Sequence, residues 1–191
     1  MFPDDVLYAK KLAVDVGATN VDFIEADIMQ LMEMHNEKYD VVFVSEGAIG
    51  WLPNLMKWGQ TIRHLLKNDG YFYIFESHPI ALMFDEGKLN SGITEIKYPY
   101  FKTTPDIDNS IGGYASEAKQ GVETFFWMHK TSDVLNSLIS AGLRIEFFHE
   151  FQENYYDMGG GKRVDGNLYK FEYNNGLFPM SFSLKASVYS K

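Results

Sequence analysis

Polar residues that can move protons directly follow an apolar run in the first half of the chain. Ser45, Glu46, Gly47 and Ala48 come after the β-branched and aromatic run at residues 41–44. The carboxyl end of a buried strand is where open α/β sheets bind their ligands. Glu46 in that position can act as a general base or orient a substrate amine or hydroxyl. An equally open interpretation is a polar loop in which glycine satisfies the turn geometry.

Histidines lie near the ends of other apolar runs. His78 closes a segment that begins with Glu76, directly after the run at residues 71–75. A glutamate and a histidine at a strand end can abstract a proton or position a nucleophile, so His78 is a candidate catalytic residue. The plainer interpretation of a single histidine is structural. His78, His129 and His149 match no zinc-binding spacing, so we expect no metal site.

The region between residues 79 and 130 is rich in aromatic side chains. Candidates for substrate contact are Trp51, from the preceding segment, and Tyr98, Tyr100, Trp127 and His129. The same aromatic wall contains Phe101, Tyr114, Phe125 and Phe126. Such a wall would enclose a small apolar or aromatic molecule and exclude water. Cross-strand packing within a hairpin explains the same rings.

Alternating helix and strand patterns must position these residues. Helical patterns occupy residues 3–16 and 55–67, and strand patterns occupy residues 21–25, 41–44 and 71–75. Strand–helix–strand repetition with short connections predicts right-handed crossovers. We therefore expect an α/β fold with a doubly wound, mostly parallel sheet and helices on both of its faces.

The second half of the chain follows a different pattern. Residues 79–130 lack a clear helical period and are interpreted as an inserted cap or hairpin. A helix is expected to begin at the N-cap cluster of residues 131–133, followed by strands near residues 144–151 and 178–189 that form a closing antiparallel hairpin. We expect a single domain over residues 1–191, divided into a partial core at 1–78, a cap at 79–130 and a C-terminal part at 131–191.

Composition limits the classes of function. The chain has 191 residues, 46% of them hydrophobic, which suffices for one packed domain. A net charge of -9 argues against nucleic acid as a partner. The absence of cysteine excludes disulfides, thiolate metal sites and cysteine nucleophiles. No apolar run reaches the roughly 18 residues of a membrane helix, and the acidic N-terminus is unlike a signal peptide. We expect a soluble, cytoplasmic protein that binds no membrane.

Five segments, in the correct order, resemble class I S-adenosylmethionine-dependent methyltransferases. They are residues 2–11, similar to the helix after the family's second strand; residues 25–28, similar to the acidic turn after its third strand; residues 39–44, similar to the YDxV pattern of its fourth strand; residues 52–54, similar to its LPD turn; and residues 65–71, similar to its LLKPGG step. Residues 140–143 also resemble the family's xAGF step.

The resemblance implies S-adenosyl-L-methionine as the cofactor. It assigns to Asp27 a hydrogen bond from the adenine amino group, and it places the Ile28 backbone amide near the ring. The resemblance also implies that the loop formed by Ser45, Glu46, Gly47 and Ala48 faces the sulfonium and the incoming substrate. Methyl transfer would be a direct SN2 displacement, promoted mainly by proximity and alignment. Taken by itself, Asp27 is better interpreted as a surface residue that caps a turn; only within the ordered set of segments is the cofactor contact favoured.

The sequence departs from this family in lacking the glycine-rich loop in its first half. The resemblance therefore predicts an N-terminally truncated core with half a cofactor site and weak binding. In the family's strand order, 3-2-1-4-5-7-6, the missing strands lie beside the strand at residues 40–44. An unpaired edge there favours a homodimer, or a sheet in which residues 21–25 pair with residues 40–44. The alternative function is a non-catalytic remnant that binds a ligand or partner. A dinucleotide-binding enzyme fits the segments at 65–71 and 178–189 poorly.

Overall fold

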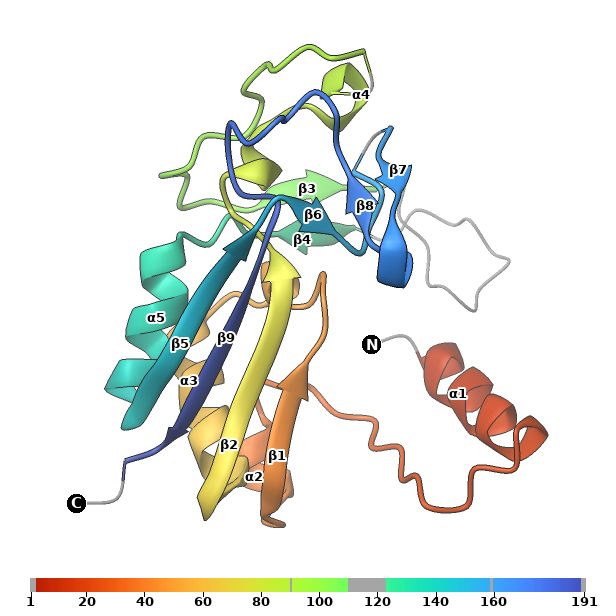
Figure 1. Cartoon of the computed structure of the whole chain (residues 1–191). Helices are drawn as coiled ribbons and strands as arrows, with labels where there is room; N and C mark the ends of the chain where they lie inside the picture. Colours follow the sequence, from red (N-terminus) through yellow and green to blue (C-terminus); the bar gives the residue numbers. More distant parts are fainter. Residues whose placement is uncertain (1–2, 90, 110–122, 159, 190–191) are drawn as a thin grey trace.

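One four-stranded sheet forms the centre of the molecule. The computed structural model describes residues 3–89, 91–109, 123–158 and 160–189. Along the chain the elements are α1 (Pro3–Asp15), α2 (Leu31–Met34), β1 (Tyr39–Val44), η1 (Ile49–Trp51), α3 (Leu55–Leu65), β2 (Leu66–Ser77), η2 (Ala81–Met83), α4 (Glu86–Leu89), β3 (Asp106–Asp108), β4 (Thr124–Phe126), α5 (Thr131–Ser140), β5 (Leu143–Phe151), β6 (Glu153–Asn154), β7 (Lys162–Arg163), η3 (Asp165–Asn167), β8 (Tyr169–Lys170) and β9 (Ser181–Val188). Two small antiparallel sheets, β3-β4 and β6-β8-β7, gather beyond the carboxyl ends of β1, β2 and β5 (Figure 1).

The strand order of the main sheet is β1-β2-β9-β5. β1 and β2 are parallel, whereas β9 is antiparallel to both β2 and β5. β1, β2 and β5 therefore point in one direction, and β9 opposes them. The sheet is mixed, so the expectation of a mostly parallel sheet is corrected. The expected closing pair of strands does form between β5 and β9, but residues 152–180, which include the β6-β8-β7 sheet, separate the two strands in place of a tight turn.

The strand predicted at residues 21–25 does not form. Residues 21–25 belong to no helix or strand in the structure, and the expected pairing with residues 40–44 is wrong. A strand needs a partner for its backbone groups, and among the described residues β1 is paired with β2 alone. β1 is consequently an edge strand, and its outward-facing Phe43 is 60% exposed.

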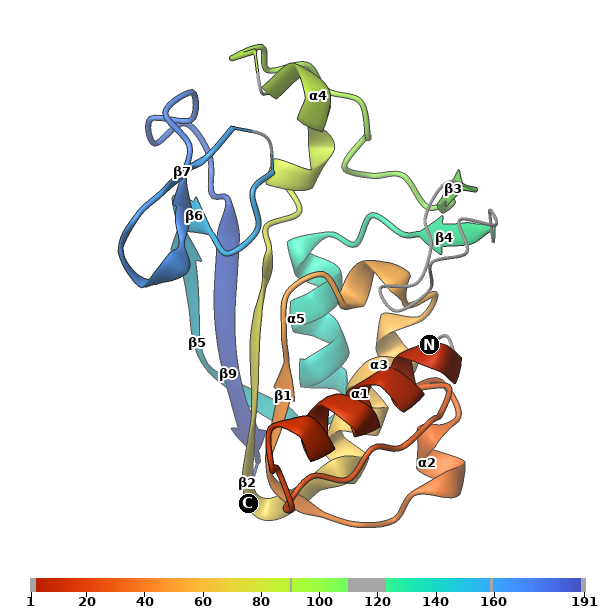
Figure 2. The same cartoon turned by 90° about the vertical axis from the view of Figure 1, so that its right-hand side faces the viewer.

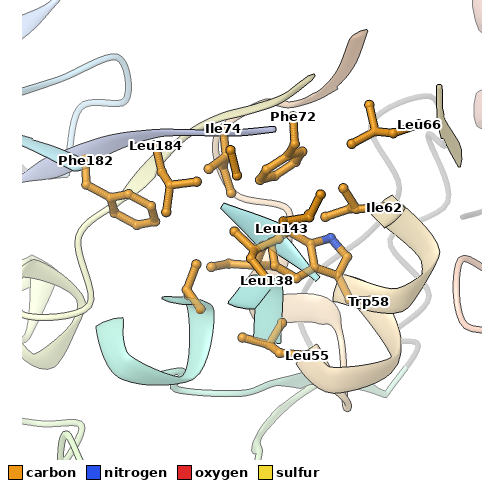
Figure 3. Close-up of a cluster of buried hydrophobic side chains, with 13 residues drawn as sticks. Leu55, Trp58, Ile62, Leu66, Phe72, Ile74, Leu138, Leu143, Phe182 and Leu184 are labelled. Atoms are coloured by element: carbon orange, nitrogen blue, oxygen red, sulfur yellow. The ribbon is translucent and has the colours of Figure 1, made fainter. Parts of the chain in front are cut away.

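The main helices cover one face of the sheet rather than two. α3 and α5 pack against each other and against this face, while α1 stands apart beyond the β1 edge (Figures 1 and 2). Between helices and sheet lies the core, in which Trp58 meets the Phe72 ring edge-on at 5.5 Å (Figure 3). The opposite face carries partly exposed aromatic side chains such as Tyr73 and Phe147. The expectation of helices on both faces is therefore corrected.

α3 follows from its sequence pattern. Its N-cap is Asn54, whose side-chain oxygen accepts a hydrogen bond from the Lys57 amide at 3.0 Å. The apolar stripe of the helix is buried, with Trp58 and Ile62 each 2% exposed. The helix ends at Leu65, slightly earlier than expected, because β2 begins at once. Residues 67–70, between the pairs Tyr39–Leu66 and Val41–Tyr71, form an irregularity in the β1–β2 register.

α3 and α5 approach closely because of a glycine. A β-carbon added to Gly59 would lie 2.4 Å from the backbone oxygen of Ser137 in α5. The obstacle is backbone, so a flexible side chain cannot relieve the contact by moving. Both helices hold their sheet-facing side chains in the same core, and a shift of either helix would disturb it.

Gly59→Ala is expected to lower the free energy of unfolding, by about 1–3 kcal/mol, because overpacking outweighs the roughly 1 kcal/mol gain in helix propensity. Urea denaturation followed by circular dichroism measures this. Gln60→Ala is the matched control, since Gln60 is exposed on the same helix and its replacement should change stability little. A Gly59→Ala protein as stable as the parent would show that the two helices are not in tight contact.

Candidate functional site

The parallel strands β1 and β2 bring two polar segments to one edge of the sheet. β1 ends at Val44 and β2 ends at Ser77, so the residues after each strand meet at the same rim. The Ser77 hydroxyl donates a hydrogen bond to Oε1 of Glu46 at 2.7 Å. This is the juxtaposition that ligand sites of open α/β sheets use.

Glu76 fixes the loop that follows β1. Its side chain is 3% exposed, and its two oxygens accept four backbone N–H bonds. Oε1 accepts from Gly47 at 2.6 Å and from Ser77 at 2.8 Å; Oε2 accepts from Ala48 at 2.9 Å and from Ile49 at 3.3 Å. Burial raises the pKa of Glu76, and the four amides oppose this rise. Because all four partners are donors, the ionised carboxylate is the form that satisfies them.

The turn itself depends on glycine. Gly47 has a φ of +80°, a conformation that side chains with a β-carbon rarely adopt. A β-carbon at this position would meet no atom within 4 Å, so the space above the turn is open. The glycine therefore serves backbone geometry, and it leaves room beside the rim.

Glu46 occupies a different environment from Glu76. Burial is the main cause that raises its pKa, and the nearby Glu76 charge adds to the rise. Hydrogen bonds from Ser77, from Asn154 and from the Tyr156 backbone lower it in part. Since the folded-state pKa is raised, ionised Glu46 opposes folding at neutral pH, and this cost is relieved as the pH falls through the raised pKa.

A cavity of about 300 Å³ opens at this rim. Its described lining combines the two glutamates and Ser77 with apolar and aromatic groups: Glu46, Gly47, Ile49, Gly50, Trp51, Glu76, Ser77, Pro79, Leu82, Phe126, Trp127, His129 and Tyr156. Trp51 and Phe126 meet edge to face at 5.4 Å between ring centroids. The arrangement can hold a small molecule with a large apolar surface against one carboxylate.

Three of the five residues predicted to contact a substrate line this cavity: Trp51, Trp127 and His129. Tyr98 lines a neighbouring cavity of about 560 Å³, which shares Trp51, Leu82, Phe126 and Tyr156 with the first. The Tyr100 hydroxyl instead accepts a hydrogen bond from the Thr131 amide at 3.1 Å, at the start of α5. Tyr114 lies outside the described residues.

The structure places His78 away from the cavity lining. Its side chain is 1% exposed, and its Nδ1 accepts a hydrogen bond from the Ile80 amide at 3.1 Å. Its Nε2 lies 3.1 Å from Oε1 of Glu150. Burial lowers the pKa of His78, and Glu150 opposes this. These contacts are those of a structural histidine, and a catalytic role for His78 stays a prediction.

Asp27 caps a turn in the structure. Its Oδ1 accepts a hydrogen bond from the Met29 amide at 2.9 Å, and the side chain is exposed. Neither Asp27 nor Ile28 is among the described residues that line the cavity beside Glu46. Their predicted contact with a cofactor therefore depends on a ligand long enough to reach from the rim to this turn.

Sequence reasoning missed two contributors from the distant segment after β5. Asn154 donates a hydrogen bond to the Ser77 hydroxyl at 2.9 Å, and Tyr156 lines the cavity. No motif marks either residue, because β6 reaches the rim only through the tertiary fold. Glu76 was predicted from the sequence, together with His78, as a group that can abstract a proton; in the structure its carboxylate instead accepts four backbone amides.

The described part of the chain contains neither a cluster of metal-binding side chains nor a membrane-spanning helix. No group of three or more metal-binding side chains occurs there. Nor does any described helix have the length and apolar character needed to cross a membrane.

Glu76→Gln is expected to lower the free energy of unfolding by about 2–4 kcal/mol, because the amide NH₂ would face two backbone N–H donors and leave them unsatisfied. Chemical denaturation at pH 7 measures the loss. Glu33→Gln is the control, because the Glu33 side chain is 73% exposed on α2 and forms only a long 3.9 Å ion pair. Equal stability of the Glu76→Gln protein and the parent would contradict the role given to Glu76.

Comparison with known proteins gives independent evidence on the family. The family described as "Methyltransferase domain" matches residues 2–74. A search among curated proteins found no match. Among solved structures, the chain is similar to an S-adenosylmethionine-dependent methyltransferase from Clostridium acetobutylicum, with a TM-score of 0.58, 12% identity, and coverage of 99% of this chain and 73% of that chain.

Two other solved structures are similar to this chain. A S-adenosylmethionine-dependent methyltransferase from Methanosarcina mazei has a TM-score of 0.56 and 12% identity, with 99% of this chain and 80% of that chain covered. The glycopeptide N-methyltransferase MtfA, in complex with S-adenosyl-L-methionine, has a TM-score of 0.51 and 12% identity, with 97% and 74% covered. The order β1-β2-β9-β5 corresponds to the 4-5-7-6 half of the sheet expected for this fold. The chain is therefore similar over residues 2–74 to the methyltransferase domain family, and it shares its fold with these S-adenosylmethionine-dependent methyltransferases.

Proposed function

We propose that this chain binds S-adenosyl-L-methionine at the β1–β2 rim and transfers its methyl group to a small molecule in the adjoining cavity. The observation that carries the proposal is the partly buried Glu46 carboxylate, which faces an aromatic cavity at the carboxyl ends of two parallel strands. Proximity and alignment between cofactor and acceptor would supply most of the acceleration.

The residues at the rim fit part of the cofactor. When bound, the cofactor supplies an electrophilic methyl group on a sulfonium cation. Glu46 and Glu76 give the rim the negative charge that complements this cation, and the open space beside Gly47 admits a ligand. The Asp27 carboxylate retains lone pairs beyond those used for its turn, so it can accept from an adenine amino group.

A weak but measurable affinity for S-adenosylhomocysteine is expected, because the first half of the sequence contains no glycine-rich loop to hold the rest of the cofactor. Isothermal titration calorimetry tests this. Asp27→Asn should weaken binding about fivefold to tenfold by removing the carboxylate, while it keeps an acceptor for the Met29 amide. Asp22→Asn is the control on the same exposed segment.

Two results would contradict the assignment. Affinity as tight as that of a fully enclosed cofactor, with no change in Asp27→Asn, would mean that the site lies elsewhere. No binding at millimolar ligand would favour the alternative, a non-catalytic module of the methyltransferase fold that binds another ligand or partner.

We also propose that two copies associate through β1. The strand is an edge with unpaired backbone groups on its outer side in the described structure, and Val41 is 43% exposed. Such edges recruit other strands, and a two-fold pair closes the assembly.

Light scattering of the purified chain should give the mass of a dimer, and Val41→Lys should shift it to the monomer by placing a charge on the edge. Arg144→Lys, a substitution at an exposed position on the opposite edge strand β5, is the control and should leave the mass unchanged. A parent chain that is monomeric at all concentrations would refute the association.

A further inference from the structure

The charges that face the cavity are all negative. Glu46 and Glu76 are its acidic lining residues, and neither lysine nor arginine is among the described residues that line it. His129 also faces the cavity, and its Nε2 lies 2.8 Å from the Leu52 carbonyl oxygen, to which it donates. Burial lowers the pKa of His129, so the ring is neutral at pH 7. The described lining therefore offers no cation to either carboxylate.

The two carboxylates differ in how they are satisfied. Glu76 is held by four backbone amides, which disperse its charge. Glu46 is contacted by Ser77, Asn154 and the Tyr156 backbone, all of them neutral. A partly buried carboxylate without a cation is costly, and a charged ligand of opposite sign relieves that cost. Neither carboxylate has a counter-charge in the described lining, but only the charge of Glu46 is left without an array of backbone amides to disperse it.

The remaining walls suit an apolar molecule with a positive end. Trp51, Phe126, Trp127 and Tyr156 contribute aromatic rings, which attract cations over their faces and cover apolar surface at their edges. The cavity of about 300 Å³ adjoins the one of about 560 Å³, and they share Trp51, Leu82, Phe126 and Tyr156. A ligand body larger than a single ring can extend from one cavity into the other.

We infer that the methyl acceptor is a primary or secondary amine on an aromatic or aliphatic body, held by an ion pair between its ammonium group and Glu46. This inference rests on the proposed function and deepens it by naming the substrate class. A carboxylic acid would meet the charges of both Glu46 and Glu76 and is disfavoured. A neutral hydroxyl compound could donate a hydrogen bond to Glu46 but would leave its charge unmatched.

The chemistry at nitrogen follows from the same carboxylate. An ammonium has no lone pair, so it must first release a proton, and Glu46 is placed to accept it. The freed lone pair forms the bond to the methyl carbon while the carbon–sulfur bond of the sulfonium breaks, and that electron pair stays on sulfur. The products are the methylated ammonium and S-adenosylhomocysteine. The Ser77 hydroxyl positions the Glu46 carboxylate throughout.

The chain carries its own reporter for binding in this cavity. It has three tryptophans, of which Trp51 and Trp127 line the cavity and Trp58 lies in the core. Quenching of tryptophan fluorescence can be followed with three probes of similar shape: 2-phenylethylamine, 2-phenylethanol and 3-phenylpropionate. No cofactor is added, so the measurement is independent of S-adenosylhomocysteine binding.

At pH 7.5 the amine is expected to bind about tenfold more tightly than the alcohol, and the acid more weakly than both. Glu46→Gln should abolish this preference, since glutamine keeps an acceptor for Ser77 but carries no charge. Glu33→Gln, an exposed glutamate on α2, should keep it. Equal binding of amine and alcohol, preference for the acid, an unchanged preference in Glu46→Gln, or no binding of any probe would each overturn the inference.

A pH series on the unmodified chain gives a second measurement that needs no variant. An alkylammonium stays charged like lysine over pH 4–8, whereas Glu46 becomes neutral as the pH falls through its raised pKa. The preference for the amine should be lost over that interval. The groups that surround Glu46 while it titrates are Glu76, Ser77, Asn154, Tyr156 and His129. His129 can gain a positive charge in the same pH range. The same pH series on the Glu46→Gln protein therefore measures how much His129 contributes to the change in amine binding. Preference that persists to pH 4 would overturn the inference.

Amine binding without S-adenosylhomocysteine binding would contradict the proposed methyl transfer, while the cavity would still be shown to bind amines.

Discussion

The buried carboxylate of Glu76 is the interaction on which the functional end of this molecule depends. Parallel neighbours such as β1 and β2 are not joined by a short turn, so nothing covalent fixes the loop after one strand relative to the end of the other. Glu76 supplies that link by accepting the amides of Gly47, Ala48 and Ile49 in addition to that of Ser77. The fixed loop then leads into η1, which presents Trp51 to the cavity.

Two glutamates at the same rim thereby take different roles. Glu76 is almost fully buried and saturated by backbone donors, so its charge serves the fold. Glu46 is less buried and faces open space, and its raised pKa makes it a better proton acceptor than an ordinary glutamate. The negative charge of Glu76 raises the pKa of Glu46 further. The structural carboxylate therefore raises the pKa of the one that faces the cavity.

The sequence predicts those features that local pattern determines. The apolar runs at residues 41–44 and 71–75 are strands, the Trp58 stripe is core, and Glu46 stands at a strand end. It does not predict features that depend on distant partners. The pattern at residues 21–25 is compatible with a strand, but no partner lies beside it. β9 lies between β2 and β5, and in the chain it comes after the small sheet of β6, β7 and β8. Asn154, in β6, donates a hydrogen bond to Ser77.

The inserted β9 also explains how the sheet tolerates one poorly covered face. Sheets with antiparallel pairs commonly bury one face and expose the other, whereas parallel sheets are covered on both. On the open face, Lys185 of β9 forms a 2.8 Å ion pair with Glu146 of β5 and lies over the Tyr71 ring at 4.8 Å. These contacts place charge among the aromatic rings and keep that face compatible with water. The shared direction of β1 and β2 still brings their carboxyl ends to a single rim, so the site depends on that one parallel pair rather than on a covered sheet.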